Sequence, residues 1–336
     1  MAWTSTHRPK TSDSGMCHAF SLIHAQKCTE GRPEWLEKIL KIISAFGQES
    51  LSDIRILNGN LAKKIKDHSV LINYRGIKKY SINQSRIIPI IQAYLHHVQS
   101  ANNSETNSKR VKARHHMEQI LNKEIEMPPG TPPLRNGKQY TYGNVLEEIA
   151  SHALNLHDDA STNTQHLVGG IMKPLSQTGI REEIYSEDME EIDGINSFMS
   201  DKDIGIILQT LEHPGSKGKS VIVMTSGHAS SIHYDHTHNQ FNFYDPNEPD
   251  GVAPYGKSMD AAKAIKEMCE RTEAFTIDDK PMLRLRFYQS RPTQEDTATT
   301  ESTQSLPTKE ESTEFLEDLR QTCKHINLEN FETDYK

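Results

Sequence analysis

Three short β-strand patterns between residues 220 and 245 constrain the fold more than any other part of the chain. The run SVIVMTS (220–226) is rich in β-branched residues, and HASSIHYD (228–235) and FNFYD (241–245) follow it closely. The last two runs are separated by HTHNQ (236–240), which has the length and polarity of a hairpin turn. Short turns join antiparallel strands, so these residues predict a three-stranded antiparallel meander.

Helical periodicity dominates the chain before this meander and returns once after it. Apolar residues at helical spacing predict the helices 17–28, about 33–46, 61–65, 87–98, about 142–156 and 258–275. A possible strand at VLINY (70–74) and a closing strand at 282–289 complete the set. We therefore expect an α+β fold. A helical lobe from the N-terminal half would face an antiparallel sheet lobe from about 200 to 290, with a cleft between them.

Polar, proline-rich stretches predict the parts of the chain outside this core. Residues 100–114 (SANNSETNSKRVKAR) show no periodicity, and the prolines of 128–138 favour an extended loop, so we expect surface insertions at about 100–200. Residues 291–312 contain too few apolar side chains to fold and predict a linker. An acidic helical segment at 313–336 would follow the domain formed by residues 1–290.

Composition excludes several classes of function. The formal net charge is −8, and Lys and Arg form no basic stripe along the sequence, so nucleic acid is not an expected partner. No apolar run is long enough for a membrane span, and the N-terminus lacks the apolar region of a secretory signal, which predicts synthesis in a cytoplasm. Four cysteines without paired spacing predict reduced thiols. One of them could serve as a nucleophile.

Cys17 has the setting of an activated thiol. The helix N-terminus and a nearby imidazolium are the two features that lower the pKa of a cysteine and favour its thiolate. In SGMCHAFSLIHA, Gly15 allows a sharp turn and Cys17 falls in the first helical turn, beside N–H groups that could also bind an oxyanion. Taken alone, a single cysteine is more often a small buried residue, so this reading depends on partners.

His228 and Asp245 are the expected partners of Cys17. Pairing of the strands on either side of HTHNQ would bring the start of one strand next to the end of the other. His228 would then accept the thiol proton, and Asp245 would orient the imidazole and stabilise its cation. Pro246 ends the second strand, so the carboxylate would lie at the edge of the sheet.

The histidines after His228 offer two alternatives. His233 is a rival for the catalytic base, although His228 has the better separation from Asp245. His233, His236 and His238 with Asp235 could instead form a metal-binding module, because imidazole and carboxylate groups bind zinc. The expected turn at this place favours a solvated hairpin over such a site. We therefore expect no metal and no other cofactor.

These motifs together resemble the papain-like cysteine peptidases, and most closely the YopT-type family of bacterial effector proteases. The resemblance lies in Gly15-Met16-Cys17 with Ser21, in His228-Ala229, and in Tyr244-Asp245-Pro246-Asn247. It implies a papain-like fold, with the nucleophile helix packed on the sheet, and the triad Cys17, His228 and Asp245. Papain-like enzymes usually have Gln or Asn before the cysteine as oxyanion donor. Here the Cys17 amide and a hydroxyl of Thr11 or Ser12 would replace it.

The expected function is a cysteine protease that a bacterium delivers into a host cell, where it acts on a host protein. The same triad also carries out deamidation, transglutamination and deubiquitination, which stay as alternatives. A non-catalytic adaptor on a degenerate papain-like scaffold is a further alternative. The Glu-rich segment 313–336 resembles the C-terminal signals of type IV-secreted effectors, although a solvated acidic tail explains the same composition.

Overall fold

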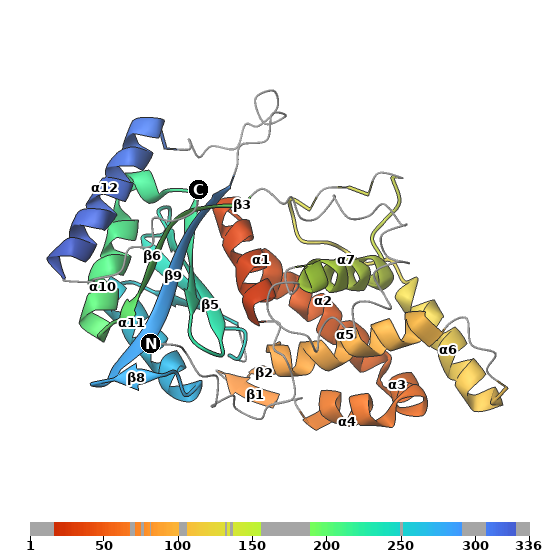
Figure 1. The fold of residues 1–336 in the computed structure, drawn as a ribbon. Coiled ribbons are helices and arrows are strands. Elements are labelled where there is room, and N and C mark those ends of the chain that lie inside the picture. Colours follow the sequence, from red (N-terminus) through yellow and green to blue (C-terminus); the bar gives the residue numbers. More distant parts are fainter. Residues whose placement is uncertain are drawn as a thin grey trace.

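A computed structural model of the 336-residue chain shows a helical lobe beside an antiparallel sheet, which confirms the α+β class (Figure 1). The structure describes residues 17–67, 71–74, 77–80, 82–100, 106–131, 133–134, 137–155, 189–248, 251–290 and 307–326. No helix in these ranges is both long and apolar enough to cross a membrane.

The sheet contains the predicted meander and extends it on both sides. Its strands are β3 (Met189–Phe198), β4 (Lys219–Met224), β5 (Ala229–Asp235), β6 (Gln240–Tyr244), β7 (Val252–Tyr255) and β9 (Lys280–Ser290). Their order is β3-β9-β4-β5-β6-β7, with every neighbouring pair antiparallel, and the short β8 (Thr276–Ile277) pairs with β9. The meander is β4-β5-β6, as predicted. The strands β3 and β7, and the position of β9 between β3 and β4, were not predicted.

The two faces of the sheet are covered by different helices. Val221 and Val223 on β4 point into a core built with α10 (Asp201–Gln209), α11 (Ser258–Arg271) and α12 (Lys309–His325). Ile222 lies between them in sequence and packs against Ala25 on α1 (Cys17–Thr29), on the opposite face. This alternation follows from the two-residue period of a strand. Two short 3-10 helices, 210–212 and 214–216, connect α10 to β4.

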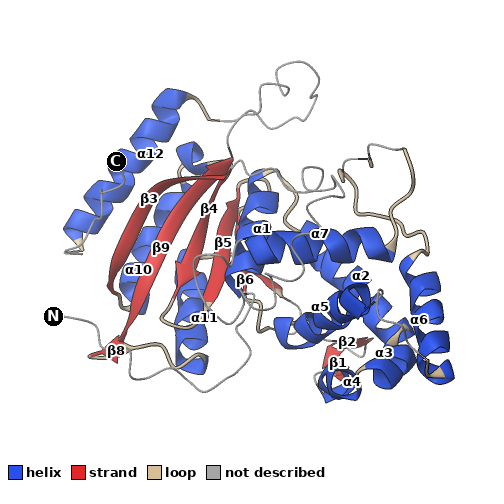
Figure 2. Ribbon diagram, turned by 45° about the vertical axis from the view of Figure 1, so that its right-hand side comes forward, coloured by secondary structure: helices blue, strands red, loops and turns tan. Residues whose placement is uncertain are grey.

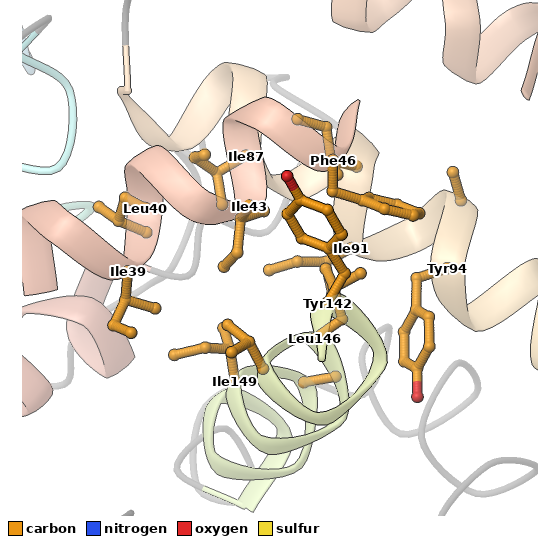
Figure 3. Close-up of a cluster of buried hydrophobic side chains, with 14 of the residues drawn as sticks. Ile39, Leu40, Ile43, Phe46, Ile87, Ile91, Tyr94, Tyr142, Leu146 and Ile149 are labelled. Atoms are coloured by element: carbon orange, nitrogen blue, oxygen red, sulfur yellow. The ribbon is translucent and has the colours of Figure 1, made fainter. Parts of the chain in front are cut away.

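The helical lobe has a core of its own. It consists of α2 (Trp35–Glu49), α3 (Leu51–Leu57), α4 (Gly59–Asp67), α5 (Gln84–Gln99), α6 (Ser108–Leu121) and α7 (Tyr142–Asn155), with a hairpin of β1 (Leu71–Tyr74) and β2 (Ile77–Tyr80). Figure 3 shows the side chains that meet at its centre, from α2, α5 and α7: Ile39, Leu40, Ile43, Phe46, Ile87, Ile91, Tyr142, Leu146 and Ile149. The predicted helices at 33–46, 61–65, 87–98 and 142–156 are therefore present, with shifted ends.

The helix α6 differs from the expected surface loop at 100–114. Asn107 caps this helix through its side chain, and Ala113, Met117 and Leu121 are buried at intervals of four residues. The polar window 100–114 ended before Met117 and Leu121, so the apolar face of the helix was hidden. Residues 101–105, 132, 135–136 and 156–188 of the insertions expected at about 100–200 lie outside the described residues.

The C-terminal helix α12 begins at Lys309, four residues before the predicted start. Phe315, Leu319 and Cys323 are buried in the core of the sheet lobe, and Arg320 bonds to Asp193 at 3.1 Å. The acidic segment thus has an apolar face that packs on the domain (Figure 2). Residues 291–306 of the predicted linker and 327–336 of the predicted tail lie outside the described residues.

Candidate active site

Cys17 is the first residue of α1, which lies between the sheet and the helical lobe (Figures 1 and 2). Its side chain is partly exposed, whereas the other three cysteines are buried. One turn further along α1, the Ser21 hydroxyl donates a hydrogen bond to the carbonyl of Ala229 at 3.1 Å. Ala229 is the neighbour of His228 in the chain, so this bond holds the helix that carries Cys17 against the strand that follows His228.

A second contact holds α1 against the sheet. The His24 ring is completely buried, its Nδ1 lies 2.8 Å from the Ser231 hydroxyl, and it stacks on Tyr244 at a centroid distance of 4.9 Å. Burial, and to a smaller extent the nearby His233, lower the pKa of His24 to about 3. His24 is therefore neutral at physiological pH. Since Tyr244 immediately precedes Asp245, the two contacts together tie α1 to both strands of the site.

The pairing of β5 with β6 brings His228 and Asp245 together. Ser231 is opposite Tyr244 in this ladder, so the residue before β5 and the residue after β6 lie at the same end of the hairpin. His228 Nε2 lies 2.8 Å from Asp245 Oδ1, and the two side chains are only 3% and 1% exposed. The two residues thus form a buried hydrogen-bonded pair.

Asp245 is fixed by the turn that follows it. The same Oδ1 accepts a hydrogen bond from the backbone N–H of Asn247 at 2.9 Å, and Oδ2 accepts one from Arg271 at 3.0 Å. Gly251, at φ +76°, closes the turn and accepts the Asp245 N–H. Burial alone would raise the pKa of Asp245. The hydrogen bond and charge of His228, with smaller contributions from Asn247 and Arg271, outweigh burial and lower that pKa.

The protonation of His228 is set by both of its partners. Burial lowers the pKa of His228, but hydrogen bonds to Asp245 and Cys17, together with their charges, raise it to about 9. Asp245 occupies Nε2, which leaves Nδ1 as the nitrogen available to Cys17. The structure therefore brings the three predicted residues into one chain of contacts. Their catalytic roles stay predictions at this point, and Thr11, Ser12 and Gly15 lie outside the described residues.

Two amide side chains adjoin this chain. Asn247 Nδ2 lies 3.4 Å from His228 Nδ1, and Asn247 Oδ1 accepts a hydrogen bond from Gln84 Nε2 at 2.5 Å. The Gln84 N–H also donates to the Pro246 carbonyl at 2.7 Å. Sequence reasoning used Asn247 only as part of the family motif and missed Gln84. Nothing in the sequence links Gln84, at the start of α5, to a turn more than 160 residues away.

The later histidines have structural partners. His233 Nδ1 lies 2.9 Å from the Lys219 carbonyl on β4, and burial is the main cause of its lowered pKa. His236 bonds to the Ser216 hydroxyl at 3.0 Å, and His238 pairs with Asp235 at 2.6 Å. His233 is thus bonded to the backbone of β4, whereas Asp245 pairs with His228. His233 therefore does not take the place of His228 as the candidate base. Among the described residues, no group of three metal-binding side chains converges.

One cavity of about 410 Å³ lies within the helical lobe, between α5, α6 and α7. Its lining includes Tyr94, His97, Glu118 and Glu147, and none of the three site residues. It is therefore separate from the cleft that the sequence predicts between the lobes.

A scan against protein-family models, a search of curated proteins and a search of solved structures found no match to this chain. The geometry of the site therefore carries the functional argument.

Proposed function

We propose that the chain is a thiol-dependent acyl-transfer enzyme, in the first instance a cysteine peptidase, with Cys17, His228 and Asp245 as its triad. The observation that supports this most is the His228 imidazole. Its Nε2 lies 2.8 Å from a buried carboxylate, and the thiol at the start of α1 is close enough to contribute, with that carboxylate, to the raised pKa of the ring. A nucleophile, a base and a group that orients the base are the three parts that such chemistry requires.

In the first step of the proposed reaction, His228 Nδ1 accepts the thiol proton of Cys17. The sulfur attacks a substrate carbonyl carbon, and the tetrahedral intermediate collapses as His228 Nδ1–H donates its proton to the leaving amine. Water then attacks the thioester and gives one proton to Nδ1, and the intermediate releases the carboxylic acid and the Cys17 thiolate. Asp245 stays ionised throughout, because it holds the Nε2–H and stabilises the cation.

We further propose Asn247 as an oxyanion donor. Its Nδ2 lies 3.4 Å from His228 Nδ1, the nitrogen that would accept the Cys17 proton. An amide N–H would therefore be available near the substrate carbonyl carbon that Cys17 attacks. The side-chain amide of Gln84 donates a hydrogen bond to Asn247 Oδ1, and this bond directs the Asn247 NH₂ group toward the site. The N–H groups at the start of α1 lack partners within the helix and would supply a second donor. This arrangement would replace the donor expected from Thr11 or Ser12.

The biological setting is proposed from the resemblance described above. The YopT-like motifs favour a papain-like fold and a bacterial effector that acts on a host protein in the host cell. The proposed triad suits hydrolysis, deamidation and amine transfer equally, because these reactions differ only in what resolves the thioester and in which bond is attacked.

The test is incubation of the full chain with a host-cell lysate, with Cys17→Ser and His228→Ala as matched inactive variants. Peptide mass spectrometry would read new N-termini, mass gains of about one unit at glutamine, and cross-linked peptides. We expect new termini in the wild-type sample and in neither variant. Mass gains or cross-links that depend on Cys17 would assign the alternative reactions. The absence of any change that depends on Cys17 would favour the adaptor.

A further inference from the structure

The cations of the helical lobe gather on three helices. Residues 54–66, on α3 and α4, and residues 108–117, on α6, contain eight of the 38 Lys and Arg residues of the chain and none of its 46 Asp and Glu residues. These eight are Arg55, Lys63, Lys64, Lys66, Lys109, Arg110, Lys112 and Arg114. We call them the basic surface. It was not visible as a stripe in the sequence because its two segments are about 40 residues apart.

The three helices are neighbours in space. The α4 helix follows α3 after a single residue, Asn58, and α3 contacts both α4 and α6. His116 on α6 bonds to Asp53 on α3 at 2.7 Å. Figures 1 and 2 show α3, α4 and α6 together at the end of the helical lobe, on the side away from α12.

Asp53, Asp67 and Glu118 flank the basic surface, but half of its cations form no ion pair among the described residues. Lys63, Lys66, Lys109 and Lys112 are exposed, and none of them forms an ion pair with another described residue. By contrast, the two lysines on the outer side of α2, at positions 38 and 41, each pair with a glutamate four residues earlier. Lys109 also lies in the first turn of α6, which contains no acidic residue. Cations at a helix N-terminus are destabilising, so an external anion would relieve the repulsion there.

Two exposed aliphatic side chains lie among these cations. Ile56 on α3 and Val111 on α6 are each 45% exposed, on two helices that contact each other. Helices with cations and exposed aliphatic residues bind the interface of anionic bilayers, where lysines meet lipid phosphates and the apolar groups enter the headgroup layer. Nucleic acid fits less well, since residues 54–66 and 108–117 contain no Phe, Tyr or Trp for base stacking.

We propose that the basic surface of α3, α4 and α6 binds an anionic membrane surface, with Ile56 and Val111 inserted among the headgroups. This role of the basic surface does not depend on the triad, because no residue of the basic surface belongs to the proposed active site. If both proposals hold, the surface would concentrate the enzyme on substrates that lie at a membrane.

Co-sedimentation of the full chain with vesicles tests this surface. The vesicles contain phosphatidylcholine alone or with about 20% phosphatidylserine, at low and high salt. We expect binding only to the anionic vesicles, with loss at high salt. The variant K63E/K66E/K109E/K112E should bind at least about 100-fold more weakly, since each surface lysine contributes about fivefold. The matched control K202E/K257E/K263E/K280E makes the same charge change at exposed lysines of the sheet lobe and should keep most of the binding.

Other results would overturn the proposal. They are equal binding to neutral vesicles, equal loss in the two variants, no sedimentation with either vesicle, or binding of single-stranded RNA in place of vesicles. All eight lysines of the two variants are exposed, and a circular dichroism spectrum would establish that each variant is folded. The variant I56D/V111D should also weaken sedimentation, with a salt dependence like that of the wild type. An unchanged affinity in I56D/V111D would refute the insertion of Ile56 and Val111.

Discussion

Replacement of Asp245 by asparagine probes the His228–Asp245 pair without a change in side-chain size. The carboxylate is 1% exposed and lies 2.8 Å from His228 Nε2, and the pKa of His228 is raised from 6.5 to about 9. A rise of that size corresponds to about 3 kcal/mol in favour of the imidazolium. Asp245 contributes to this stabilisation through both its hydrogen bond and its charge. Asp245→Asn should therefore lower the pKa of His228 by more than about one unit.

The sign of the accompanying stability change follows from linkage. A pKa that is higher in the folded than in the unfolded chain stabilises the fold below about pH 6.5, and this contribution is lost as the pH rises through about 9. The Asp245→Asn variant should lack much of this stabilisation already at pH 6. At pH 10 its free energy of unfolding should differ less from that of the wild type.

The assay is an NMR titration of ¹⁵N-histidine-labelled protein, with His228 assigned by its loss in His228→Gln. Asp235→Asn is the matched control, because it removes a carboxylate that pairs with the exposed His238. The Asp235→Asn variant should leave the pKa of His228 unchanged. The reasoning is refuted if His228 titrates near 6.5 in the wild type, or if Asp245→Asn leaves its pKa unchanged.

The remaining predictions concern groups around the triad. Asn247→Ala should lower kcat at least about tenfold with little change in KM, whereas Asn247→Gln, which keeps the amide, should retain more activity; equal losses in kcat and in substrate affinity would refute an oxyanion role. The free energy of unfolding of the wild type should fall by about 3 kcal/mol between pH 6.5 and 4 because of His24. Its pKa of about 3 prevents proton uptake in the folded state, whereas the unfolded chain takes up the proton. Urea unfolding of His24→Phe should show a smaller loss over that range, and an unchanged slope would contradict this reasoning. Cys28→Ser should keep full activity, since Cys28 is buried and its pKa is raised by burial; loss of turnover in a folded variant would count against Cys17 as the nucleophile.

Local patterns predicted the parts of the fold that depend on neighbours in sequence. The β4-β5-β6 meander needed only short turns, and its pairing follows from the hairpin at 236–239. The placement of β9 between β3 and β4 joins segments far apart in the chain, and no local signal encodes it. The helix α6 was missed because most of its buried apolar residues, Met117, Ile120 and Leu121, lie beyond the polar window 100–114.

The candidate site could likewise be predicted only where its residues are close in sequence. His228 and Asp245 lie on one hairpin, so strand pairing was enough to bring them together. Cys17 could be linked to them only by the motif resemblance, because more than 200 residues separate it from His228. Ser21, His24 and Gln84 position the site through contacts with Ala229, Ser231 and Asn247, and each of these contacts exists only in the folded chain. A serine, histidine or glutamine in a helix has no sequence signature for such a role.

The central claim is that Cys17 is the nucleophile and that His228 is its base. The most direct test is the rate at which iodoacetamide alkylates Cys17 between pH 5.5 and 8, measured by peptide mass spectrometry in wild type and His228→Ala. Each rate is divided by the rate for the same cysteine in the urea-unfolded chain, which removes differences in reagent reactivity. An ordinary thiol alkylates about tenfold more slowly for each unit of pH below about 8.5. We predict that this ratio at pH 5.5 is at least about tenfold higher in the wild type than in His228→Ala. Equal ratios in the two proteins would contradict the account.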